Sequence, residues 1–378
     1  MEPLLKHRTI SRQLTTEIIA GKYSKTGRLP SEAQLVKQFG VSRPTVGRAM
    51  RELQEQGLIE RRAGSGTYVR PEKDRGHSAH SAFPQIGLIM PSLFHTEIFE
   101  PICGELASLA RVNDYGLLWG ANMSSIAETQ MKAAEAEALC EQFIERGVVG
   151  VFFVPFEHQT DREATNLRIT ERLKKAGIPL VLIDRDIGVF PNRSEFDIVG
   201  VDNVAGGYLL ADHLIKLGNR RMMFVNRPLT APTVDFRIIG AQKAILDNGL
   251  EVPQPFVHSG DPTDIKFVKS FVQNQKIEAI LCTNDHLAAE LLQTLTRIGI
   301  RVPKDLRLVG FDNVRFASLL STPLTTVEQP VRDIAITAFS ALRERMTDST
   351  LPPRTLILTP RLIVRESCGA YLHQGRSG

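Results

Sequence analysis

The hydrophobic and polar positions of the first 70 residues predict two short helices. Ser31 stands before an apolar-periodic run and Gln34 follows three residues later, which is the pattern of a capping box at a helix start. Gly40 ends this helix. A second helix follows, and its apolar residues recur at helical spacings and form one buried face: Val46, Ala49, Met50 and Leu53.

After Gly57 the pattern becomes that of a hairpin, with strands over 58–62 and 67–69 joined by the tight turn 63–66. Helix, turn, helix and basic hairpin in this order predict a winged helix-turn-helix, which lays its second helix in the DNA major groove. The residues expected to contact DNA are Ser31, Arg43, Thr45, Arg48, Arg61 and Gly66. The alternative is that these residues only form a solvated face or shape a turn.

The distribution of charge favours DNA as the partner of this first part. Residues 1–76 carry 15 Lys and Arg against 8 Asp and Glu, whereas the remaining residues carry 31 against 34. A phosphate-binding surface requires such a local positive excess.

Beyond residue 70 the chain changes character twice. Residues 71–84 are polar and have no periodicity, so we expect a linker. From residue 85 short apolar strands alternate with amphipathic helices, which predicts βαβ units and parallel sheets of an α/β fold. Almost 300 residues are long for one open sheet, and two lobes with a cleft between them are expected. The predicted strands are 86–90, 116–120, 148–154, 180–183, 198–201, 221–225, 279–283 and 306–311.

The first part resembles the GntR family of bacterial regulators. The matching motifs are L-P-S-E at 29–32, V-S-R-x-T-V at 41–46 and G-L-I-x-R-x-x-G-x-G-T-x-V at 57–69. The family often has Arg directly after T-V, where this chain has Gly47 and then Arg48. Arg43 and Arg48 therefore both remain candidates for the residue that reads a base.

The second part resembles the effector domain of the lactose/galactose-repressor family, which implies a two-lobed, periplasmic-binding-protein-like fold. The resemblance divides the chain into a winged helix-turn-helix domain (1–70), a linker (71–84) and a sugar-sensing, dimerising effector domain (85–378), a layout similar to that of arabinose repressors. The matching runs include IGLIMPS (86–92), GIPLVLIDR (177–185), VGVDNVAGGYLLADHLIKLGNRR (199–221) and VPKDLRLVGFDN (302–313).

Ligands of open α/β lobes bind beyond the carboxyl ends of strands, so polar residues at these positions are candidates for a site. Asp184, Asn284 and Asp312 follow predicted strands, and Arg237 opens a helix after another. Carboxylates accept hydrogen bonds from sugar hydroxyls, and Arg or Asn donates to them. The resemblance implies the same four positions. Each Asp or Asn could instead only cap a helix. The choice of a stacking aromatic stays open among Phe94, Phe99, Phe156 and Phe236.

The interpretation is a dimeric, sugar-controlled repressor that binds operator DNA. The alternative is a carbohydrate-pathway enzyme with a DNA-binding regulatory head, but the sequence shows no catalytic motif and we expect no enzyme activity. We expect a cytoplasmic protein without membrane attachment, since no signal peptide or long apolar run is present. No cofactor or metal is expected, because the cysteines make no metal motif: Cys103, Cys140, Cys282 and Cys368.

Overall fold

The chain folds into two units, residues 1–84 and 85–378, and each is described by itself. Among the described residues, no helix combines the length and the apolar character needed to cross a membrane. The predicted linker 71–84, the helix end at Gly57 and the turn 63–66 fall mostly or wholly outside the described residues. The computed structural model describes residues 3–19, 21–23, 26–55, 58–62, 66–70, 83–90, 98–119, 133–157, 160–188, 190–272 and 276–372.

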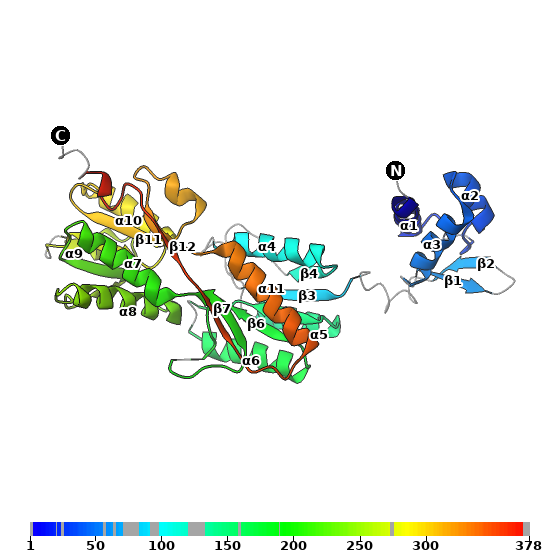
Figure 1. Ribbon diagram of the computed structural model, residues 1–378, viewed down its shortest axis with the longest axis horizontal. Coiled ribbons are helices and arrows are strands. Elements are labelled where there is room, and N and C mark those ends of the chain that lie inside the picture. Colours follow the sequence, from blue (N-terminus) through cyan, green and yellow to red (C-terminus); the bar gives the residue numbers. More distant parts are fainter. Residues whose placement is uncertain are drawn as a thin grey trace. The chain divides into compact units, whose positions relative to one another are not determined.

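The first unit, called the head, has the predicted order of elements. The capping box is confirmed, because the Gln34 N–H donates to Ser31 Oγ at 3.3 Å and the Ser31 N–H donates to Gln34 Oε1 at 2.8 Å. Gly40 ends the helix with φ 61, a left-handed conformation that suits glycine. Its described elements are α1 (Pro3–Ile19), α2 (Glu32–Phe39), α3 (Arg43–Glu55) and the antiparallel strands β1 (Ile59–Arg62) and β2 (Gly66–Val69) (Figure 1).

The core of the head is formed by α3 and by a helix that the pattern did not predict. The predicted apolar face of α3 is confirmed, since Val46 and Met50 are fully buried together with its other members. The unpredicted helix is α1, which packs on α3 and buries Ile10, Leu14 and Ile18. Its many β-branched Thr and Ile residues have modest helix propensity and conceal a narrow apolar stripe at a spacing of four.

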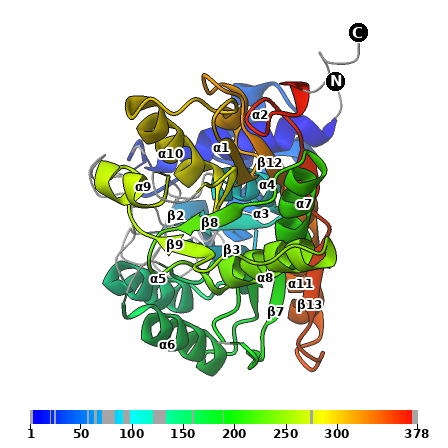
Figure 2. The ribbon, with the colours of Figure 1, turned by 90° about the vertical axis from the view of Figure 1, so that its left-hand side faces the viewer.

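The second unit consists of two lobes, each built on a parallel sheet (Figures 1 and 2). Within the described residues the first lobe has the strand order β13-β7-β6-β5-β3-β4, and all its strands are parallel. Its elements are β3 (Gln85–Ile89), α4 (Phe99–Val112), β4 (Gly116–Trp119), α5 (Ala133–Glu145), β5 (Gly150–Phe153), α6 (Arg162–Lys175), β6 (Leu180–Ile183), β7 (Asp197–Val201), α11 (Val331–Thr347) and β13 (Thr355–Leu358).

The second lobe has the order β14-β12-β11-β10-β8-β9 within the described residues, and its edge strand β14 runs antiparallel to β12. Apolar strands buried on both faces of each sheet form the lobe cores, as expected for parallel sheets covered by helices. Its elements are α7 (Asn203–Lys216), β8 (Met222–Asn226), α8 (Pro232–Asp247), β9 (Val257–Ser259), α9 (Ile265–Val272), β10 (Ala279–Cys282), α10 (Asp285–Arg297), β11 (Arg307–Asp312), η1 (Arg315–Ser318), β12 (Thr325–Glu328), β14 (Arg361–Ile363) and η2 (Ala370–Leu372).

The chain passes between the lobes at three short crossovers. The first leads from β7 to α7, the second from β12 to α11, and the third from β13 to β14. The Asp202 N–H of the first crossover donates to Leu358 O at the start of the third, at 2.9 Å. Any change in lobe orientation must therefore alter the backbone at these three places.

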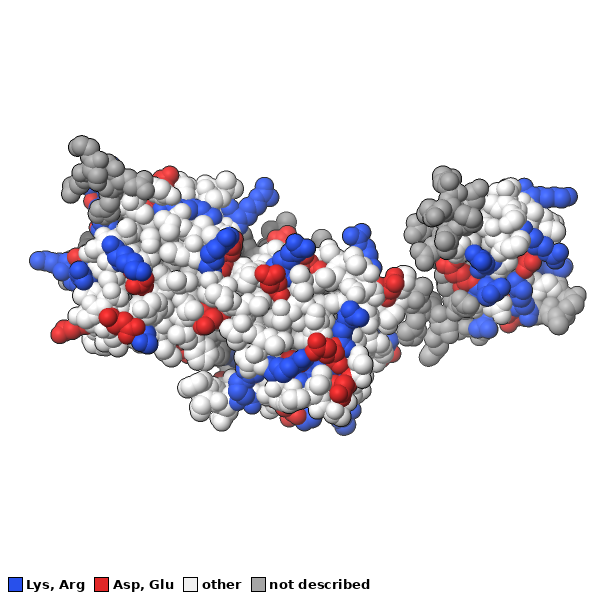
Figure 3. Space-filling model, in the orientation of Figure 1, with Lys and Arg blue, Asp and Glu red and all other residues white. Residues whose placement is uncertain are grey.

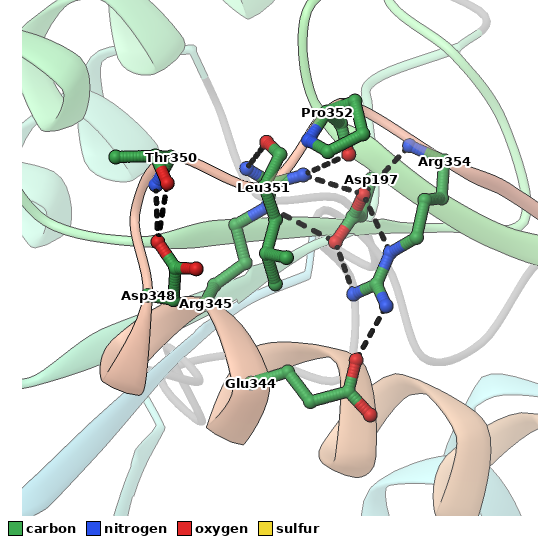
Figure 4. A network of polar contacts seen from close by, with 8 residues as sticks. All are labelled: Asp197, Glu344, Arg345, Asp348, Thr350, Leu351, Pro352 and Arg354. Atoms are coloured by element: carbon green, nitrogen blue, oxygen red, sulfur yellow. Dashed lines mark hydrogen bonds and ion pairs between the residues drawn. The ribbon is translucent and has the colours of Figure 1, made fainter.

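A buried carboxylate at the start of β7 holds three elements of the first lobe together. Asp197, at the start of β7, is fully buried and accepts hydrogen bonds from both Arg345 of α11 and Arg354 beside β13 (Figure 4). Burial opposes its ionisation, but the hydrogen bonds from the two guanidinium groups hold the pKa of Asp197 below its usual value. The network ties β7, α11 and β13 together, so that the crossovers start from a rigid base.

The eight predicted strands are present, and each differs from the prediction by at most two residues at an end. The predicted start of one helix was wrong: α8 begins at Pro232, so Arg237 lies in its second turn and does not open it. Proline fits the first turn because that turn needs no N–H from it. Four strands were not predicted, since they are short and either polar or half-exposed: β9, β12, β13 and β14.

Candidate functional site

The four residues predicted to bind a ligand approach one another. Asn284 follows β10, Asp312 ends β11 and Arg237 lies on the helix after β8; these three strands are parallel neighbours in one sheet. Their carboxyl ends therefore share one edge. Asp184 follows β6 of the other lobe, and its charge acts on the pKa of both Arg237 and Asp312. The structure thus gathers residues from both lobes into one polar cluster.

Arg237 lies at the centre of this cluster and is only 6% exposed. Its Nε donates to Asn203 Oδ1 at 2.8 Å, and its Nη1 donates to Thr283 O at 2.6 Å. Its guanidinium carbon lies 3.7 Å from the centroid of the Phe311 ring, a cation–π contact. Burial lowers the pKa of Arg237, while the charges of Asp312 and Asp184 raise it. These contacts hold the guanidinium in one orientation.

Asp312 is 5% exposed and accepts a hydrogen bond from Gln329 Nε2 at 2.7 Å. Burial raises the pKa of Asp312 to about 7, against the opposing effects of the Arg237 charge and the Gln329 hydrogen bond. Asp312 and Asp184 both have positive φ angles, 114° and 73°. Such backbone is uncommon for residues other than glycine and gathers at functional sites.

The raised pKa of Asp312 predicts a pH-dependent cost to stability. Between about pH 4 and 7 the unfolded chain loses this proton while the folded chain keeps it, so stability falls with rising pH and the full cost remains above pH 7. Asp312→Asn should therefore stabilise the second unit more at pH 8 than at pH 4.5, by up to ~4 kcal/mol. Thermal unfolding of the full chain at both pH values measures this difference.

A control of opposite sign is Asp305→Asn. Asp305 is exposed and Arg301 holds its pKa down at about 2, so ionised Asp305 favours folding above about pH 4 and this contribution is lost as pH falls towards 2. Its replacement should remove stability at neutral pH. An Asp312→Asn variant that loses the same stability at both pH values would contradict the expected role of burial.

Asn284 caps α10, because its Oδ1 accepts from the Leu287 N–H at 2.9 Å. The capping role weighed from the sequence is therefore present. The cap uses only the side-chain oxygen, and no hydrogen bond of the Asn284 amide nitrogen is formed with the described residues. A ligand hydroxyl could accept from that nitrogen while the cap stays intact.

The first lobe contributes a second arginine, which directly follows Asp184 after the same predicted strand. Arg185 is 3% exposed, and its guanidinium pairs with Asp184 Oδ2 at 2.8 Å and with Glu157 Oε1 at 2.7 Å. Both carboxylates raise the pKa of Arg185 against the effect of burial. Glu157 also reaches across to the other lobe, where its Oε2 accepts from the Ala231 N–H at 3.1 Å. Arg185 thus holds both Asp184 and Glu157, and Glu157 in turn contacts the second lobe.

Arg162 makes a further contact between the lobes. Its Nη1 donates to both Leu229 O and Thr230 O, each at 2.8 Å, just before α8. These two carbonyls and the Ala231 N–H belong to one short segment, which hydrogen-bonds to two side chains of the first lobe, Arg162 and Glu157. This contact of Arg162 could not be predicted from the sequence pattern, because its acceptors are backbone atoms far along the chain.

The four aromatic candidates occupy different places. Phe99 is buried beneath Arg185, and Phe156 is buried in the core of the first lobe. Phe236 is half-buried and packs edge-on against Phe190 of the other lobe, with ring centroids 5.7 Å apart. Phe94 lies outside the described residues. Phe236 is therefore the described candidate that also joins the two lobes.

In the head, four of the six predicted DNA-contact residues line one concavity of about 1140 Å³ between α2, α3 and the hairpin: Ser31, Arg43, Arg61 and Gly66. Arg43 begins α3 with its side chain 81% exposed, and Arg61 extends from the hairpin with 46% exposed. Glu32 lies between them, 2.7 Å from Arg61 Nη2 and 3.8 Å from Arg43 Nε. Arg48 is also exposed on α3, outside its buried face. Figure 3 shows several Lys and Arg side chains on the face of the head turned to the viewer.

The remaining head residues have local roles as well. Ser31 belongs to the capping box, and the hydroxyl of Thr45 contacts the Ser42 hydroxyl at 2.8 Å. Gly66 has φ 121, and a Cβ there would lie 2.9 Å from Arg28 Nε. Arg28, which the sequence analysis did not single out, is exposed, lines the same concavity and covers the Tyr68 ring. Glycine at position 66 lets this arginine lie against the hairpin.

Comparisons with known proteins agree with both units. Residues 6–69 match the family described as bacterial regulatory proteins, gntR family, and residues 211–368 match the periplasmic binding protein-like domain. The arabinose metabolism transcriptional repressor of Geobacillus stearothermophilus is 28% identical over 374 residues, covering 96% of this chain and 98% of the relative. That of Halalkalibacterium halodurans is 26% identical, covering 96% of each chain. The solved transcriptional regulator CelR–cellobiose complex has a TM-score of 0.63 at 22% identity, over 90% of this chain and 100% of that one.

These matches define the class: a GntR-type DNA-binding domain followed by a two-lobed, periplasmic-binding-protein-like domain. Because the similarity to repressors extends over nearly the whole length of both chains, the chain is a ligand-controlled, DNA-binding transcriptional repressor. The fold class and the class of function predicted from the sequence are confirmed.

Proposed function

We propose that the controlling ligand is a small neutral sugar, bound by Asp184, Arg237, Asn284 and Asp312. The observation that carries this proposal is that, within the described residues, each of the four side chains has one polar atom without a hydrogen-bond partner. Within the described residues, no hydrogen bond is formed by Asp184 Oδ1, Asp312 Oδ2, Arg237 Nη2 or Asn284 Nδ2.

The chemistry of these atoms suits vicinal hydroxyl groups. The two carboxylate oxygens accept, the two nitrogens donate, and each hydroxyl of a sugar can do both. An anionic ligand is disfavoured, since the three carboxylates of Asp184, Glu157 and Asp312 lie around the guanidinium groups of Arg185 and Arg237. Residues from both lobes contribute, so the sugar favours one lobe orientation and thereby alters operator binding.

The relatives named as arabinose repressors make arabinose the first compound to test, and cellobiose is the second. A ligand present at about 100 times its Kd should stabilise the second unit by ~2.7 kcal/mol, which thermal unfolding detects. Calorimetry then gives the affinity, and product analysis of the same samples tests the alternative of a carbohydrate-pathway enzyme. Unchanged sugar with a shifted melting temperature supports a sensor, whereas turnover would contradict it.

We further propose that the chain acts as a homodimer in the cytoplasm and that each head binds one half-site of a symmetric operator. Arg43, Thr45 and Arg48 at the exposed side of α3 are the candidates for base contacts, and Ser31, Arg61 and Gly66 for contacts to the backbone or the minor groove. Arg pairs well with guanine, and the Thr methyl can contact thymine.

Arg43→Ala tests the assignment in the head. If Arg43 pairs bidentately with a guanine, specific binding should weaken by roughly 1–3 kcal/mol, because alanine cannot form that pair. Within the described residues, the exposed Arg43 guanidinium has Glu32 at 3.8 Å as its one ionic partner. Gel-shift titration compares a selected operator with scrambled DNA. An equal loss on both DNAs would show that Arg43 touches only phosphate. Lys37→Ala on α2 is the control, because Lys37 is not among the proposed contact residues.

A further inference from the structure

Two of the proposed sugar-binding residues are bound directly to the crossovers between the lobes. Arg237 Nε donates to Asn203 Oδ1, and Asn203 is the first residue after the β7–α7 crossover. Asp312 Oδ1 accepts from Gln329 Nε2, and Gln329 lies in the β12–α11 crossover. Both amides are nearly buried, with 7% and 5% of their surfaces exposed.

Asn203 is also tied to the backbone of its own crossover through its side chain, and Gln329 through its main chain. Asn203 Nδ2 donates to Val201 O at 3.0 Å, so one side chain bridges Arg237 and the last residue of β7. Gln329 O accepts from the Val331 N–H at 2.8 Å at the start of α11, and Pro330 between them has a fixed φ. The positions of Arg237 and Asp312 therefore depend on the conformation of the crossovers.

We propose that Asn203 and Gln329 are positioning residues that convert sugar binding into a change of lobe orientation. This inference rests on the proposed function. A ligand shifts a conformational equilibrium only by its difference in affinity for the two states. The two amides create such a difference, because the orientation of the sugar-binding side chains changes when the crossover backbone changes.

The two hydrogen bonds of Asn203 allow a sharp test. In Asn203→Asp a carboxylate oxygen still accepts from Arg237 Nε, but the donor to Val201 O is lost. Sugar affinity should therefore stay within about threefold, whereas the coupling factor, which is the ratio of operator Kd with and without sugar, should fall about tenfold or to near one. A residue that only supports the fold would not separate these two quantities.

Gln329→Met is the second variant, and it keeps the length of the side chain without the donor to Asp312. Its coupling factor should fall by more than its sugar affinity. Gln242→Met on α8 and Asn248→Ala at its C-cap are matched controls, since within the described residues neither side chain hydrogen-bonds to a crossover or to the four proposed ligand residues. Both controls should retain the coupling factor of the unmodified chain.

The experiment uses the full chain, arabinose as the probe and an operator selected by the unmodified protein from a random pool of duplexes. Gel shifts with and without arabinose give the coupling factor, calorimetry gives the arabinose Kd, and circular dichroism verifies folding. If the unmodified chain neither binds nor responds to arabinose or to cellobiose, the proposed function fails and this inference falls with it. If the unmodified chain responds and both variants respond equally, only the inference is overturned.

Discussion

Replacing Arg237 by alanine is expected to abolish the response to arabinose and to leave operator binding without sugar nearly unchanged. The guanidinium is buried, donates to Asn203 Oδ1 and Thr283 O, and is the cation that lowers the pKa of Asp312. Its loss leaves these buried acceptors without a donor and removes a charge-assisted contact to the sugar. We expect arabinose affinity to fall about 100-fold or more, since each of these losses costs about 1.5–3 kcal/mol.

Calorimetry with arabinose and gel shifts with a selected operator measure the two effects separately. Arg301→Ala is the matched control, because the Arg301 side chain is 69% exposed and pairs with Asp305 on the surface of the same lobe. That control should bind arabinose normally. A folded Arg237→Ala protein that binds arabinose with the affinity of the unmodified chain would rule out the proposed site.

The sequence predicted the alternation of strands and helices well, because parallel strands buried on both faces are written as nearly continuous apolar runs. Val151 and Leu182 lie in such runs and are fully buried. The strands that escaped prediction are held by partners far along the chain: β13 pairs with β7, and β14 pairs with β12. Their residues are half-exposed, so local periodicity carries little information about them.

The candidate site was predictable where a polar residue follows a strand, as Asp184 and Asp312 do. Their left-handed backbone could not be predicted, since it depends on the surrounding fold. Asn203 and Gln329 were missed because their side-chain amides hydrogen-bond to residues far along the chain. Asn203 bonds to Arg237, 34 positions away, and Gln329 bonds to Asp312, 17 positions away. Such pairings follow from the crossing of the chain between lobes, and a motif of neighbouring residues does not contain them.

Gly207→Ala is expected to have the largest effect on stability, because α7 and α8 meet there backbone to backbone. A Cβ at position 207 would lie 1.9 Å from Arg237 O, and one at Gly240 would lie 2.0 Å from Val204 O. Backbone cannot move aside as a flexible side chain does, so the helices must separate and Arg237 must shift with α8. We expect the second unit to lose ~3 kcal/mol or more, with a matching loss of arabinose affinity.

Gly104→Ala provides the matched comparison within a helix of the same unit. Among the described residues, no atom lies within 4 Å of a Cβ at Gly104 on α4, so alanine should only restrict the unfolded chain and stabilise the protein by roughly 0.5–1 kcal/mol. Thermal unfolding of the full-length variants, with and without arabinose, measures both changes. If Gly207→Ala melts together with the unmodified chain and keeps its arabinose affinity, close packing of α7 on α8 is not what holds Arg237 in position.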